Sequence, residues 1–134
     1  MYKLSAFILL SVLLTSCTSS PSNSAHQLTG QARPAITPAE VLVYNEPPAQ
    51  FTEIATVTAT SGASTIPSNT DKKADVLMAL KAEAAALGAN GIILTMLKED
   101  VETDQVPMSN GTQQYVRNVT KYYQTANGIA IFIE

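Results

Sequence analysis

The chain has a single cysteine, Cys17, a single histidine, His26, and no tryptophan among its 134 residues. One cysteine cannot form a disulfide within the chain, so the core has to stabilise the fold unaided. A zinc site built from clustered histidine and cysteine ligands is excluded because these residues are too few. Nucleophilic catalysis needs a base beside the nucleophile, and the only imidazole lies in a polar segment. We therefore predict that the chain is not an enzyme and binds no cofactor.

Positive charge is also scarce. Eight lysines and arginines stand against eleven aspartates and glutamates, which gives a net charge of -3 at pH 7. A nucleic-acid partner would require a basic face, which this composition does not provide. The length of the chain suits one domain rather than two. The sequence thus predicts one mildly acidic domain that does not bind nucleic acid.

Residues 1–16 have the composition of a bacterial secretory signal peptide. Lys3 supplies a positive charge, and residues 4–14 form an apolar run that is shorter than the ~20 residues of a membrane span. The run ends in Leu14-Thr15-Ser16-Cys17, which resembles the lipobox of bacterial lipoproteins. The resemblance implies that Cys17 is acylated and becomes the N-terminus of the mature protein. The alternative is an incidental cysteine in a signal peptide that is cut elsewhere.

An acylated Cys17 would attach the protein stably to a membrane, because two or three acyl chains suffice for anchoring. The next residue is Thr18 rather than aspartate. By the sorting rule that the lipoprotein resemblance implies, this residue favours the outer membrane. We expect a lipid-anchored protein on the periplasmic side of the cell outer membrane.

The segment after the lipobox, residues 17–37, is rich in serine, threonine and proline and includes His26. Such a segment buries too little apolar surface to offset its ordering entropy. We predict a disordered tether over 17–37 and a single folded domain over 38–134.

The domain shows one clear helix, over 71–87, in which Leu77, Leu80, Ala84 and Leu87 form an apolar stripe. Short β-rich or alternating runs surround it, and Asn127-Gly128 is a strong hairpin signal. We expect two strands before the helix and three after it, at 41–44, 51–60, 92–97, 115–124 and 129–133. The prediction is an α+β fold, with a single helix packed on a mostly antiparallel sheet in the order β-β-α-β-β-β.

The run from Leu80 to Leu94, with Leu87-Gly88-Ala89-Asn90 at its centre, resembles the helix–turn–strand core of two groups. These are the YbjQ-type small domains and the RcsF-type envelope lipoproteins, and the closing Gly128-Ile129-Ala130-Ile131 also fits their layout. The RcsF-type resemblance implies an envelope-stress sensor that signals through protein contacts. The domain of those proteins is pinned by disulfides, which this chain does not have. The YbjQ-type resemblance implies a homo-oligomeric ring.

The acidic run 99–104 is the best metal candidate. Asp100, Glu102 and Asp104 have the 1, 3, 5 spacing of a calcium loop, but Gln105 replaces its glycine and Gly111 its final glutamate. The other interpretation is a solvated loop or an edge-strand face whose charges oppose aggregation.

An aromatic and cationic stripe is expected further along, if the strand there is regular. It consists of Tyr115, Arg117, Lys121 and Tyr123. This stripe could bind a partner, a glycan or an anionic headgroup, or it could be the solvent face of a long hairpin. Together the observations favour a non-catalytic lipoprotein that contacts an envelope protein as a sensor or adaptor. The alternative is a metal- or small-ligand-binding lipoprotein that uses 99–104, and a homo-oligomer is a further alternative.

Overall fold

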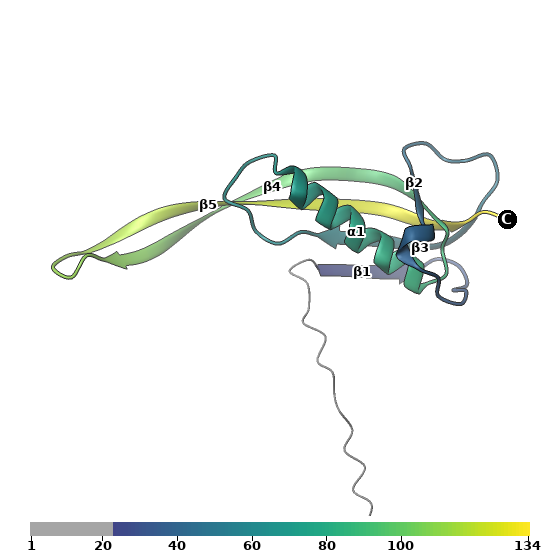
Figure 1. Cartoon of the computed structure of the whole chain (residues 1–134), viewed down its shortest axis with the longest axis horizontal. Helices are drawn as coiled ribbons and strands as arrows, with labels where there is room; N and C mark the ends of the chain where they lie inside the picture. The colour runs from purple at the N-terminus through teal and green to yellow at the C-terminus, as the bar shows by residue number, and fades with distance from the viewer. Residues whose placement is uncertain (1–22) are drawn as a thin grey trace, which may run out of the picture.

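A computed structural model describes residues 23–134 of the chain. It contains one α-helix and one five-stranded sheet of order β1-β3-β5-β4-β2, in which only the β2–β4 pair is parallel. The helix lies across one face of the sheet (Figure 1). The predicted α+β class is confirmed. The elements are β1 (Asn23–Leu28), η1 (Pro38–Glu40), β2 (Leu42–Tyr44), β3 (Thr52–Thr60), α1 (Thr70–Ala86), β4 (Gly91–Ser109) and β5 (Gln114–Phe132).

Helix α1 begins and ends within one residue of the prediction. Its N-cap is Asn69, whose side chain accepts hydrogen bonds from the amides of Asp71 and Lys72 at 2.9 and 3.2 Å. Gly88 follows the helix with φ at +76°, the left-handed conformation that closes many helices.

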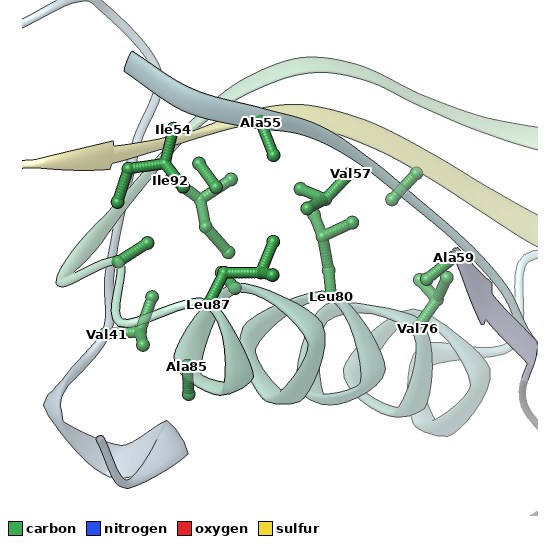
Figure 2. Packing of buried hydrophobic residues seen from close by; sticks show 14 residues of the cluster. Val41, Ile54, Ala55, Val57, Ala59, Val76, Leu80, Ala85, Leu87 and Ile92 are labelled. Atoms are coloured by element: carbon green, nitrogen blue, oxygen red, sulfur yellow. The ribbon is translucent and has the colours of Figure 1, made fainter. Parts of the chain in front are cut away.

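The core lies between α1 and the covered face of the sheet. Leu80 and Val76 of the helix point toward Val57 and Ala59 of β3 (Figure 2). Small residues let the helix approach the sheet closely, as at Ala126 and Ala130 of β5. The buried cluster is Val41, Ile54, Ala55, Val57, Ala59, Val76, Leu80, Ala84, Ala85, Leu87, Ala89, Ile92, Ala126 and Ala130.

The prediction of a disordered tether is wrong for residues 23–37. Strand β1 pairs antiparallel with β3, from Asn23 opposite Thr60 to Leu28 opposite Ala55. The chain then returns along the helix end, where the amide of Arg33 donates to the Leu87 carbonyl at 2.9 Å. The prediction rested on the scarcity of apolar side chains in this segment. An edge strand, however, is held by main-chain hydrogen bonds, which do not depend on apolar side chains. The folded part therefore includes residues 23–37, while the predicted signal peptide, the lipobox and residues 17–22 lie outside the described residues.

The prediction of a hairpin turn at Asn127-Gly128 is also wrong. Gly128 lies within β5, opposite Val57 on one side and Leu94 on the other. A Cβ atom at this position would lie 2.5 Å from Cγ2 of Ile92, so the glycine permits close packing rather than a turn. The strands predicted at 115–124 and 129–133 are one strand, which places three strands before the helix and two after it.

The turn between β4 and β5 lies instead at residues 110–113. The side-chain oxygen of Asn110 accepts from the amides of Thr112 and Gln113 at 3.1 and 2.8 Å, and Gly111 has φ at +92°. This is the turn chemistry expected of an Asn-Gly pair. Residues 98–109, which lie between the strands expected at 92–97 and 115–124, are therefore part of β4.

Candidate interaction arm

The hairpin of β4 and β5 extends beyond the rest of the sheet. Strand β3 stops pairing with β5 where Thr60 lies opposite Thr125, and a single bridge joins Ser64 to Tyr122. Strand β2 pairs with β4 only over Gly91–Ile93, yet β4 and β5 stay paired as far as Ser109 and Gln114. Within residues 23–134, nothing pairs with the outer edges of this hairpin beyond that bridge. We call residues 102–121 the arm.

The arm is long relative to the domain. Ser109 at the turn lies eleven positions after Lys98, which is in the last row of the wider sheet. At ~3.3 Å per residue this is about 36 Å. Figure 1 shows the arm projecting past the end of α1, with neither of its faces covered by the helix.

The two groups of candidate residues lie on one face of this hairpin. Residues directly opposite each other in an antiparallel pair share a face. Asp100 lies opposite Tyr123 and Glu102 opposite Lys121, and Arg117 and Tyr115 follow on the same face opposite Val106 and Met108. The acidic run and the aromatic and cationic stripe, predicted as separate features, are thus the two halves of one surface, on the side of the hairpin away from α1.

Charge pairs run along this face. The Nζ atom of Lys121 pairs with Asp104, and this pairing raises the pKa of Lys121. The Nζ atom of Lys98 lies 2.9 Å from Asp100, and its hydrogen bond, with a second from Thr125, lowers the pKa of the Asp100 carboxyl. Asp100 and Asp104 thus each have a lysine partner within the hairpin.

The calcium-loop interpretation of Asp100, Glu102 and Asp104 is not supported by this geometry. The three residues occupy every second position of a regular strand, so the Cα atoms of neighbouring members lie ~6.6 Å apart. Their carboxylates therefore do not converge on one ion as those of a calcium loop do. Over residues 23–134, no group of three histidine, cysteine, aspartate or glutamate residues could hold a metal. The structure places these residues on a strand face, the other interpretation of the sequence.

A second polar cluster, which was not predicted from the sequence, joins β1 to α1. The Nδ1 atom of His26 contacts one oxygen of Glu83, and the Ser24 hydroxyl donates to the other oxygen at 2.7 Å. We call Ser24, His26 and Glu83 the clasp. Partial burial raises the pKa of Glu83, but the hydrogen bonds from His26 and Ser24 outweigh it and hold the pKa below its ordinary value.

The clasp is not a catalytic triad. Serine and histidine both contact the carboxylate and the hydroxyl does not donate to the imidazole, so no base is placed to activate it. Two signals in the sequence point to this arrangement. Ser24 and His26 have the period-two spacing of one strand face, and Glu83 lies at the edge of the apolar stripe of the helix.

A shallow hollow lies at the opposite end of the sheet from the arm. It has a volume of about 590 Å³ and is lined by residues 48–52 and 132–134. Beside it the guanidinium of Arg33 stacks over the ring of Phe132, 3.7 Å from the ring centroid. The hollow contains a single carboxylate side chain, that of Glu134, which gives it little chemistry of its own.

No helix among the described residues is long and apolar enough to cross a membrane. No family model matches the chain, and no curated protein is significantly similar to it. A solved structure with a similar course is the crystal structure of the Francisella virulence factor FvfA. It has 15% sequence identity and a TM-score of 0.46, covering 79% of this chain and 96% of that one. A likeness of this degree carries no argument about the present chain.

Proposed function

We propose that this chain is a non-catalytic, lipid-anchored protein of the bacterial envelope that acts through contact with a protein partner. Cys17 holds the anchor, on the periplasmic side of the outer membrane, and the arm makes the contact. The observation that carries the proposal is the projection of the arm, whose outer main-chain edges are unpaired within residues 23–134.

An unpaired edge is a ready template for another strand. The main chain of a partner can add to the edge, and its alternate side chains then read the side chains of the arm. Val101, at the base of the arm, is 60% exposed and Val116 is 61% exposed, so apolar surface accompanies both strands. The charged residues at 102, 104, 117 and 121 disfavour partners that lack complementary charge.

The described part of the chain offers little for catalysis. Its imidazole and the nearest hydroxyl both contact Glu83, and its acidic run lies spread along a strand. A binding role uses what the fold does provide, which is a long exposed surface on a compact base.

Photocrosslinking in intact cells tests this function. A photoreactive residue is placed at Glu102 on one face of the arm, at Thr103 on the other, and at Met78 as a control on α1. All three positions are exposed. We expect one discrete protein adduct from an arm position and none from Met78. Adducts from Met78 alone, or none from the arm, would contradict the proposal, and adducts only with the chain itself would replace it with self-association.

The anchor is tested separately, by intact mass and radiolabelled palmitate incorporation of the native protein. A Cys17→Ala variant should lose the label and leave the membrane fraction. Label retained in that variant would contradict lipid attachment at Cys17.

A further inference from the structure

Two segments leave the sheet at the same end. Asn23, Thr60, Thr125 and Lys98 form one row across β1, β3, β5 and β4. Beyond this row the arm continues outward, and Asn23, the first described residue of β1, lies at the same end of the sheet. Asn23, through which the domain is joined to Cys17, therefore lies at the end of the sheet from which the arm extends, with β3 between β1 and β5.

The lengths of these segments differ. Asn23 lies six positions after Cys17, and a fully extended chain spans at most ~3.6 Å per residue, or about 22 Å. The arm reaches about 36 Å beyond the same row, at ~3.3 Å per residue. If Cys17 is held at a membrane surface, the end of the arm is long enough to reach that surface.

The end of the arm differs in composition from its base. Residues 105–116, which we call the tip, contain no charged side chain, whereas Glu102 and Asp104 lie closer to the domain. Tyr115 and Val116 are 49% and 61% exposed. Tyr115 lies opposite Met108 on one face of the hairpin, and Val116 lies opposite Pro107 on the other face. The tip is thus uncharged, and each of its faces carries exposed apolar side chains.

A protein groove would cover one face of such a hairpin, whereas a lipid surface surrounds it. Tyrosine favours the membrane interface, where its ring is sheltered and its hydroxyl is hydrated. Arg117 borders the tip, at the position where lipid phosphates would lie, and the nearest carboxylates stay outside. The unpaired main-chain edges exclude the hydrocarbon centre, so the tip fits the headgroup layer.

We propose that the tip seats in the phospholipid headgroup layer of the membrane that holds the Cys17 anchor. The inference rests on the proposed function, because it needs the anchor. The anchor raises the local concentration of lipid at the tip, so that weak contacts suffice. With two attachments, the base of the arm is held close above the membrane, where residues 102–104 and 117–121 are left for the protein partner.

The absence of tryptophan permits a specific probe. Tyr115→Trp places one fluorophore in the tip. Phe51→Trp is the matched control, because Phe51 is 39% exposed and lies at the end of β3 that is away from the arm. Each mature chain, purified without acyl groups, is coupled through Cys17 to maleimide lipid. The vesicles are of phosphatidylethanolamine and phosphatidylglycerol with brominated acyl chains.

We expect emission from the Tyr115→Trp variant to shift to the blue, to be quenched by brominated lipid and to lose quenching by iodide. The Phe51→Trp variant should stay quenched by iodide alone. Arg117→Glu in the Tyr115→Trp background should reverse the shift. Iodide quenching that is equal in the two variants would overturn the proposal. A blue shift that appears without vesicles and grows with concentration would overturn it too, in favour of a second copy of the chain.

The coupling chemistry separates this inference from the proposed function. Maleimide lipid supplies an anchor whether or not cells acylate Cys17, so a failure of the tip to bind reports on the tip alone. The palmitate experiment reports on the anchor alone.

Discussion

His26 and Glu83 lie 57 positions apart in the sequence and join the first strand of the sheet to the helix. The contact fixes an edge strand that the composition of residues 17–37 did not predict. Ser24, two residues earlier on the same strand face, bonds the other oxygen of the same carboxylate. The clasp therefore holds the N-terminal side of the domain to its core.

Replacing Glu83 by glutamine should destabilise the domain by about 1 kcal/mol at neutral pH, because a charge-assisted contact of a partly exposed pair is lost. Urea unfolding measures this difference. Glu46→Gln, at an exposed loop position, is the control and should change stability little. Equal effects of the two substitutions would contradict a role for the clasp.

The pH dependence of that difference has a defined sign. The pKa of Glu83 is lowered in the folded state from its ordinary value of 4.5. A lowered carboxyl pKa contributes stability that is present above the unfolded value and is lost as the pH falls through the folded one. The gap between the wild type and Glu83→Gln should close below about pH 4.5, and a gap that widens in acid would show that another group is responsible.

Gly128→Ala should destabilise the domain by about 1–3 kcal/mol, because the added methyl group meets a well-packed core. Its Cβ would lie 2.5 Å from Ile92 and 3.6 Å from Leu80. Thermal unfolding of Asn127→Ala, the neighbouring substitution, serves as the comparison. If the pair formed a turn, both changes would harm the fold; in the middle of β5, only the glycine should matter.

Amide exchange should separate the arm from its base. Residues 102–109 and 114–121 form a two-stranded ribbon without core packing, and such ribbons are marginally stable. We expect them to exchange much faster than residues 126–131, which lie between β3 and β4. Hydrogen exchange with mass spectrometry measures both. Equal protection of the two regions would mean that the arm is covered, for example by a second copy.

Calcium should leave the melting temperature of the domain unchanged. A ligand that binds only the folded state raises stability with its concentration, and the carboxylates of Asp100 and Asp104 are paired with different lysines instead of converging. Differential scanning fluorimetry with and without calcium tests this. A rise in melting temperature that disappears in Asp100→Asn would restore the metal interpretation.

The helix and its core were predictable because both depend on local pattern. The 3, 4, 3 spacing of Leu77, Leu80, Ala84 and Leu87 marks the buried side, and Gly88 ends the helix as expected. Of these four, Leu77 is only partly buried, since it lies at the margin of the contact with the sheet.

The long strands and the edge strand were not predictable in the same way. β1 depends on main-chain pairing with residues some 30 positions away, which polar composition does not reveal. Gly128 looked like a turn residue because sequence alone cannot separate a glycine needed for φ above zero from one needed for close packing. The candidate residues at 100–104 and 115–123 were identified singly, whereas their common face follows from the register of β4 and β5.

The position of β1 also determines how the domain would respond to mechanical load. Tension applied through Cys17 would reach the domain at Asn23, along the axis of β1 and across its six pairings with β3. Hydrogen bonds of an antiparallel pair lie perpendicular to the strands, so this pull loads them together in shear rather than one after another. If the sheet were held while the anchor was pulled, the domain would therefore resist unfolding, because all the β1–β3 hydrogen bonds would have to break together. The contact between His26 and Glu83 would add to this resistance.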